Sequence, residues 1–181
     1  MSSPPKIEIA GLPLSIEEFR AQRDLVAWTP HGGAAMMVVA LLAFAEGEEL
    51  GKQCLAVAVD RSRLEEGPYG YRGWQLGARE RNLISAQLRD HPYIPRSYIR
   101  SATPENGYQL PAPPYSIACE ESPYSGHPGS GTFKAFVVSS GADSPRPVRM
   151  ERNTKGIWKA AEWSSLIVGV QPPVNQIDDD L

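Results

Sequence analysis

The sequence contains few of the residues that build disulfide frameworks and metal sites. It has two cysteines, Cys54 and Cys119, among 181 residues, and both lie in apolar segments. Two cysteines are too few for a disulfide framework, and a cysteine in an apolar segment packs most often as a small hydrophobic side chain. The three histidines, His31, His91 and His127, are not spaced as metal ligands. We therefore predict two buried, unpaired thiols and no metal site.

Long apolar runs and an excess of positive charge are also missing. The most apolar run covers residues 34–45, which is shorter than the roughly 20 residues that a membrane-spanning helix needs. Residues 1–15 hold no apolar core of the kind found in signal peptides. The net charge of −3 gives no overall attraction to nucleic acid. These features predict a cytoplasmic protein without membrane insertion or nucleic-acid binding.

Three widespread motifs of catalysis and nucleotide binding are absent from the chain. There is no G-x-S-x-G pattern, which places a serine nucleophile on a sharp turn. There is no phosphate-binding G-x-x-x-x-G-K-[ST] loop and no G-x-G-x-x-G dinucleotide pattern. Close helix packing explains the pair Gly32 and Gly33 better than an anion site at the helix start does. We therefore expect no cofactor, and the sequence identifies no catalytic residue.

The first half of the chain shows helical patterns. Ser15 and Glu18 form a capping-box pattern at the start of a helix expected over residues 16–26. Thr29 is a good N-cap for a second helix, which Gly47 ends. Apolar residues cover nearly the whole circumference of this second helix, as in a helix at the centre of a protein. It should therefore be almost fully buried.

The next segments are less regular. Residues 48–59 predict a third helix or, as the alternative, a buried strand, because their apolar run is short. Residues 60–76 are rich in glycine and tyrosine and predict a loop. Residues 77–91 predict a fourth helix, which ends before Pro92. A short helical turn and a long proline-rich connection follow.

From residue 115 the apolar pattern changes to a period of two, which indicates β-strands. Five strands are expected, over residues 115–121, 132–140, 146–153, 156–163 and 165–171. The motif RNTKG is expected to form a hairpin turn. Helices followed by strands predict an α+β fold in which an N-terminal helical layer packs on a C-terminal antiparallel sheet. We expect one domain over residues 1–173 and a polar, acidic tail over residues 174–181.

Aromatic residues and arginines are mixed in the middle of the chain. The aromatic residues are Tyr69, Tyr71, Trp74, Tyr93, Tyr98, Tyr108, Tyr115 and Tyr124, and the arginines are Arg72, Arg96 and Arg100. This mixture is typical of a binding surface. It is equally typical of loops that pack as a satellite core with exposed hydroxyl groups. Both interpretations stay open, and packing is the one that we favour.

The motif GADSPRP, residues 141–147, raises a similar choice. Asp143 and Ser144 are residues that bond their own backbone in turns, and the two prolines restrict the backbone. A turn explains all of these residues except Arg146, whose side chain could pair with Asp143 or reach a partner. We expect Asp143 to accept backbone N–H groups and Arg146 to lie across neighbouring polar groups. The motif should join two neighbouring strands.

Several longer motifs carry a resemblance to a known family. The segments GGAAMMVVALLAFAE, ENGYQLPAPP and FVVSSGADSPRPVRM, followed by GIWKAAEWSSLIVGVQPP, resemble a family of uncharacterised bacterial proteins that is classed as a domain of unknown function. The likeness covers roughly residues 28–173. It implies a bacterial, single-domain protein, but it implies no activity and no catalytic residue.

The sequence favours a binding or protein-interaction module over an enzyme. The expected surface joins the connection at residues 100–115 to the GADSPRP turn, with Asp143, Arg146, Tyr108 and Arg100 as the binding residues. Another protein is the expected partner, and the sequence leaves the oligomeric state open. The alternative is a small hydrolase or transferase with its site near the same turn. A deep pocket with convergent polar groups would favour the enzyme, and a flat aromatic patch would favour the module.

Overall fold

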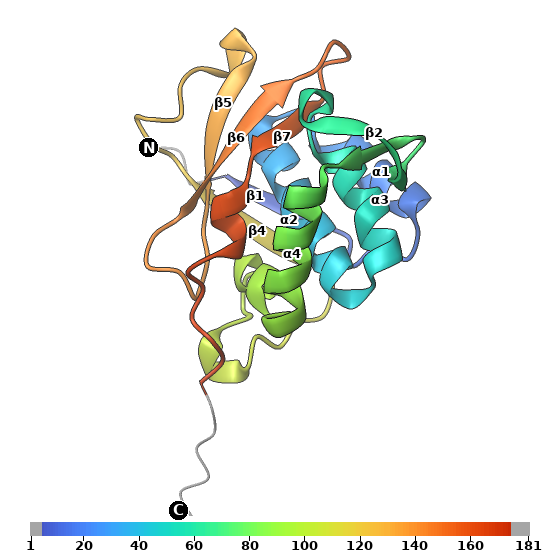
Figure 1. The fold of residues 1–181 in the computed structure, drawn as a ribbon. Helices are drawn as coiled ribbons and strands as arrows, with labels where there is room; N and C mark the ends of the chain where they lie inside the picture. Colours follow the sequence, from blue (N-terminus) through green and yellow to red (C-terminus); the bar gives the residue numbers. More distant parts are fainter. Residues whose placement is uncertain (1–4, 175–181) are drawn as a thin grey trace, which may run out of the picture.

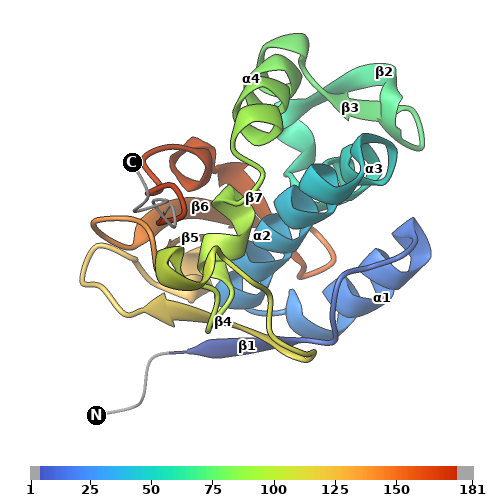
Figure 2. The same ribbon diagram turned by 90° about the horizontal axis from the view of Figure 1, so that it is seen from below.

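The computed structural model describes residues 5–174 and shows a five-stranded antiparallel sheet packed against helices. The strand order is β1-β4-β5-β6-β7, and a separate two-stranded sheet, β2–β3, packs on α3. Figures 1 and 2 show α2 between the sheet and the other helices. The predicted α+β class is confirmed. The expected tail, residues 174–181, lies outside the described part of the chain except for Val174.

The elements have the following bounds. The helices are Ile16–Val26 (α1), Pro30–Glu46 (α2), Glu48–Ala58 (α3) and Ala78–Asp90 (α4). The strands are Lys6–Ile9 (β1), Leu64–Tyr71 (β2), Trp74–Leu76 (β3), Tyr115–Glu120 (β4), Thr132–Val137 (β5), Arg146–Arg152 (β6) and Trp158–Glu162 (β7). Short 3₁₀ helices include Arg61–Arg63 (η1), Ile94–Tyr98 (η2) and Ser164–Ile167 (η5). Among residues 5–174, none of the helices has both the length and the hydropathy that crossing a membrane requires.

The helices begin where their capping residues predict. The Ser15 hydroxyl accepts the Glu18 N–H at 3.1 Å, and the Thr29 hydroxyl accepts the Gly32 N–H at 3.0 Å. The Glu18 carboxylate accepts the N–H of Leu14 rather than that of Ser15, so the box closes one residue earlier than the simplest pattern. Residues 48–58 form a helix, which decides between helix and strand for this segment.

Helix α2 is the centre of the hydrophobic core. Val39 is 1% exposed and Leu42 is fully buried, as expected for a helix that is apolar all round. At its start, a Cβ atom on Gly32 would lie 1.7 Å from the Val26 carbonyl oxygen, and one on Gly33 would lie 2.6 Å from the Trp158 carbonyl oxygen. The two glycines therefore let α1 and β7 approach α2 closely, which confirms the packing interpretation of this pair.

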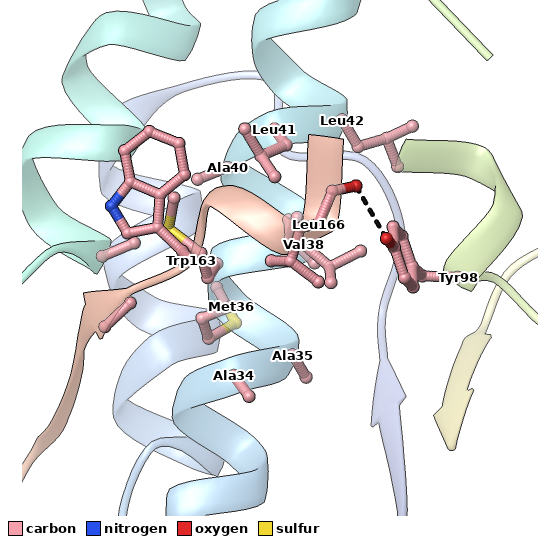
Figure 3. Close-up of a cluster of buried hydrophobic side chains, with 14 of the residues drawn as sticks. Ala34, Ala35, Met36, Val38, Ala40, Leu41, Leu42, Tyr98, Trp163 and Leu166 are labelled. Carbon is pink, nitrogen blue, oxygen red and sulfur yellow. Dashed lines mark hydrogen bonds between the residues drawn. The ribbon is translucent and has the colours of Figure 1, made fainter. Parts of the chain in front are cut away.

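One predicted strand is a 3₁₀ helix instead. Residues 165–171 were expected to form the last strand, but η5 occupies the start of this segment. Leu166 and Ile167 are both fully buried, and two neighbouring residues of a strand cannot both face the core. The Tyr98 hydroxyl donates a hydrogen bond to the Leu166 carbonyl oxygen at 2.7 Å, which ties η5 to η2 (Figure 3).

One further expectation is wrong, and one strand was not expected. Residues 60–76 are not a loop, because they contain η1 and the β2–β3 hairpin. The first strand, β1, precedes all the helices and pairs with β4, so the sheet is not purely C-terminal. The pattern of β1, KIEI, is only four residues long, so its alternation is a weak strand signal. By contrast, Cys54 and Cys119 are buried and unpaired as predicted.

The central position of α2 makes a stability prediction. Leu42→Ala should lower the free energy of unfolding by about 2–5 kcal/mol, because it removes buried methyl groups and leaves a cavity. The same substitution at Leu25, which lies on α1 and is 76% exposed, should cost less than about 0.5 kcal/mol. Urea unfolding of both variants measures the difference, and equal losses would contradict the central placement of α2.

A cationic pocket as candidate functional site

The structure brings three of the four expected binding residues to one region. The GADSPRP motif joins the neighbouring strands β5 and β6, as predicted. The Arg146 guanidinium bonds the carbonyl oxygens of Val168 at 3.2 Å and Gly169 at 2.9 Å, and it contacts Asp143 at 3.2 Å. Its side chain is 15% exposed, so Arg146 does lie across polar groups rather than in solvent. This arrangement stabilises the turn without requiring a ligand.

Asp143 does not act as expected. In the described part of the chain its carboxylate accepts hydrogen bonds from the side chains of Ser144 and Arg146, and from no backbone N–H group. It is 89% exposed. A backbone hydrogen bond stabilises the turn instead, because the Gln171 N–H donates to the Gly141 carbonyl oxygen at 2.7 Å. The expectation of an Asx turn at this residue is therefore wrong.

Tyr108 and Arg100 have different surroundings: Tyr108 is buried and Arg100 is exposed. Tyr108 is fully buried, and its hydroxyl donates to the Gln171 carbonyl oxygen at 2.5 Å beneath the turn. Burial raises the pKa of Tyr108 to about 12, so the hydroxyl stays protonated. Arg100 is exposed and lines a different hollow of about 290 Å³ that also includes Ser140. The four residues do not converge on one cavity.

Charged residues converge elsewhere, in a pocket of about 400 Å³ between α1, the β2–β3 hairpin and the turn before β7. We call it the cationic pocket. Among the described residues that line it, one, Asp60, is acidic and six are basic: Arg20, Arg23, Arg61, Arg72, Lys155 and Lys159. These six are a third of the 18 lysines and arginines in a chain whose net charge is −3. Such a concentration of positive charge favours an anionic ligand.

Helix α1 supplies one wall of the pocket. Arg20 and Arg23 are three residues apart and therefore share a face of the helix. The Arg20 guanidinium donates to the Tyr71 hydroxyl at 3.0 Å, which ties α1 to the β2–β3 hairpin. Arg23 is 9% exposed, and its Nε donates to Asp24 at 2.9 Å. Both arginines are thus held by the fold rather than free in solvent.

The hairpin β2–β3 forms the second wall. Its turn consists of Arg72 and Gly73, and both have positive φ values, 51° and 83°. This pattern is the type I′ turn, whose twist matches that of the strands it joins. The turn holds Arg72 at the pocket, with its guanidinium 5.1 Å from the centre of the Tyr71 ring. Arg61, from η1, stacks on Trp74 at 4.2 Å.

The hairpin between β6 and β7 closes the pocket. The Asn153 side chain accepts the N–H groups of Lys155 and Ile157, both at 2.9 Å, and so shapes the predicted RNTKG turn. This turn places Lys155 among the residues that line the pocket. Lys159, the second residue of β7, also lines the pocket and is half-buried. Its amine donates to the carbonyl oxygen of Val57 in the last turn of α3.

Lys159 has an unfavourable electrostatic environment. Its pKa is lowered to about 8, chiefly by burial and next by the charge of Arg23. Arg20 acts in the same direction, and Asp60 and Asp24 oppose the shift. The lysine therefore destabilises the folded state at neutral pH. Residues that cost stability in this way are frequent at functional sites.

The remaining basic residues of the pocket also lack acidic partners. Among residues 5–174, Arg20, Arg61, Arg72, Lys155 and Lys159 have no carboxylate within 4.0 Å, and only Arg23 has one. Elsewhere on the surface Arg63, Arg89 and Arg96 each pair with a glutamate. The pocket thus keeps most of its positive charge available. Among the described residues, no group of three or more His, Cys, Asp or Glu side chains is placed to hold a metal ion.

A family comparison agrees with the resemblance noted in the sequence. A sequence model described as "Domain of unknown function (DUF6935)" matches residues 11–174. The chain belongs to the DUF6935 family. No curated protein and no solved structure matches it. The part of the chain that the DUF6935 model covers includes all six basic residues of the cationic pocket.

The contacts of the GADSPRP turn predict which of its charged residues matters for stability. Asp143→Ala should change the free energy of unfolding by less than about 0.5 kcal/mol, because its ion pair is exposed. Arg146→Ala should cost about 1–3 kcal/mol, because it removes hydrogen bonds from a charged donor to two backbone carbonyl groups. Urea unfolding tests both. A larger loss for Asp143→Ala than for Arg146→Ala would contradict this prediction and would show that the Asp143 carboxylate stabilises the turn.

The lowered pKa of Lys159 predicts a pH-dependent change in stability. Below pH 8 the folded state holds a proton that it disfavours relative to the unfolded state, and between about pH 8 and 10.5 only the unfolded state retains it. Lys159→Met should therefore be more stable than the wild type by about 1–3 kcal/mol at pH 7. The difference should shrink as the pH rises to 10. Denaturant unfolding of both proteins at several pH values measures it, and a constant difference would contradict the pKa shift.

Proposed function

We propose that the protein is a binding module whose cationic pocket holds a small anionic molecule with carboxylate or phosphate groups. The observation that carries this proposal is the set of five basic residues around one pocket without a carboxylate partner. Arginine binds such groups through a planar fork of N–H donors, and lysine binds them as a point charge. The volume of about 400 Å³ lies within the range of small-molecule sites.

The aromatic contacts of the arginines support a simpler explanation, in which these residues only pack the hairpin against α1. That explanation accounts for Arg20, Arg61 and Arg72, whose guanidinium groups lie over Tyr71 or Trp74. It does not account for Lys159, because placing an amine beside Arg23 lowers stability. We therefore favour binding over packing at this pocket, which reverses the preference that the sequence suggested for its aromatic residues.

Titration calorimetry with citrate tests the proposal. Citrate should bind, and added salt should weaken its binding, because salt screens the exposed charges of the pocket that attract the anion. The double variant Arg72→Asn, Lys155→Gln should weaken binding about tenfold, or ~1.4 kcal/mol. Asparagine tolerates the positive φ of the turn, so Arg72→Asn removes charge without straining the hairpin.

The control is Lys134→Gln, which removes an exposed charge from β5 outside the pocket and should leave citrate binding unchanged. Affinity should also fall as the pH rises through about 8, where Lys159 loses its proton. Lys159→Gln should abolish this pH dependence. Binding that is absent, or equal in the double variant and the control, would contradict the proposed function.

The expectation of a protein partner at Asp143, Arg146, Tyr108 and Arg100 stays a hypothesis. The exposed Asp143 and Arg100 are the residues of this group that a partner could contact directly. Bacterial origin and a cytoplasmic location likewise stay predictions from the sequence. The alternative of a small enzyme near the GADSPRP turn has less support. Among the described residues, Ser97 and Ser140 in the hollow beside it bond backbone carbonyl groups or another serine, and not a basic side chain.

A further inference from the structure

Lys159 is placed where its amine can meet a bound ligand. It extends from β7 and lines the cationic pocket together with Arg20 and Arg23 of α1 and with Asp60, the N-cap of η1. Its backbone is fixed on both sides, because the Trp158 N–H bonds the Ala27 carbonyl oxygen and the Asp60 N–H bonds the Ala160 carbonyl oxygen, both at 2.8 Å. The backbone of Lys159 is thus held in place at the wall of the pocket.

A purely structural role explains part of this geometry. Val57 lies in the last turn of α3, and a lysine that donates to a carbonyl group there satisfies the end of the helix. Such a role would be served best by a fully charged lysine with acidic neighbours. Arg23 and Arg20 on α1 instead favour the neutral amine, and the acidic neighbours Asp60 and Asp24 do not offset burial and these two charges. The surroundings therefore suit a nucleophilic amine better than a capping cation.

Desolvation and a neighbouring cation together are a known way of activating a lysine. With a pKa of about 8, roughly a quarter of the amine is neutral at pH 7.5, against about 0.1% for an ordinary lysine. The arginines that lower the pKa are also the groups that would hold an anionic substituent of the ligand. One arrangement thus supplies both the nucleophile and the electrostatic attraction.

We propose that the Lys159 amine forms an imine with the aldehyde or ketone group of a small anion held in the cationic pocket, such as a 2-oxo acid. This inference rests on the proposed function, since the arginines must first bind the anion. The neutral amine nitrogen attacks the carbonyl carbon, and the C=O π bond breaks. The nitrogen then gives up one proton and the oxygen takes one up, which gives a carbinolamine. The carbinolamine then loses water, which carries away the oxygen, and an imine remains. No electrons are gained or lost, so the step needs no further reactant.

Reductive trapping tests this inference. The full-length protein is incubated with pyruvate and sodium cyanoborohydride, which reduces an imine to a stable secondary amine. Peptide mass spectrometry then locates the added carboxyethyl group among the five lysines, Lys6, Lys52, Lys134, Lys155 and Lys159. We expect at least tenfold more modification at Lys159 than at Lys6, Lys52 or Lys134. Acetone, which has the ketone but no carboxylate, should show no such preference.

Two variants separate this inference from the proposed function. Lys159→Gln should lose the preferred adduct, and its citrate affinity at pH 7 should fall only to the value that the wild type shows above pH 8, where Lys159 is neutral. The double variant Arg72→Asn, Lys155→Gln should bind citrate about tenfold more weakly and should form the Lys159 adduct more slowly. Even labelling of all five lysines, with citrate binding intact, would overturn the imine and leave the anion site standing. If the wild type does not bind citrate, both the imine and the proposed anion site are overturned.

Discussion

The burial of α2 on all sides is the constraint on which the rest of the structure depends. A helix with no polar face must be covered by other elements around its whole circumference, and here the sheet, α1 and α3 cover it. At its first turn Gly32 and Gly33 allow the end of α1 and the start of β7 to approach within backbone contact. The Trp158 N–H then bonds the Ala27 carbonyl oxygen directly. This contact brings Arg23 and Lys159 to the same pocket.

The features that local chemistry decides could be predicted from the sequence. Ser15 and Thr29 cap their helices through bonds that span three residues, and Asn153 shapes its hairpin turn through bonds to N–H groups two and four residues away. The core position of α2 follows from its composition alone. The sequence also resembles a domain of unknown function, and the DUF6935 match over residues 11–174 agrees with that class. For these elements the nearest neighbours in the chain supply the deciding interactions.

The features that were missed depend on contacts between distant residues. The segment SLIV has a strand-like composition, but a hydroxyl 68 residues away in the chain fixes it as a 3₁₀ turn. The cationic pocket draws on residues from Arg20 to Lys159, and its basic residues do not form a motif. One local signal was available, because YRGW contains a two-residue X-Gly turn between aromatic residues. That signal predicts the hairpin, but it does not predict which helix the hairpin covers.

The scattered origin of the pocket has a consequence for the lifetime of the protein. Its walls come from α1, η1, the β2–β3 hairpin and β7, so they are assembled only when the whole chain between them has folded. An anion that binds there binds the native state and not the unfolded chain. At a hundred times its dissociation constant such a ligand would stabilise the protein by about 2.7 kcal/mol, which lowers the unfolded fraction about a hundredfold. Proteases that degrade unfolded chains would then remove the protein more slowly, so its abundance would follow the concentration of its ligand.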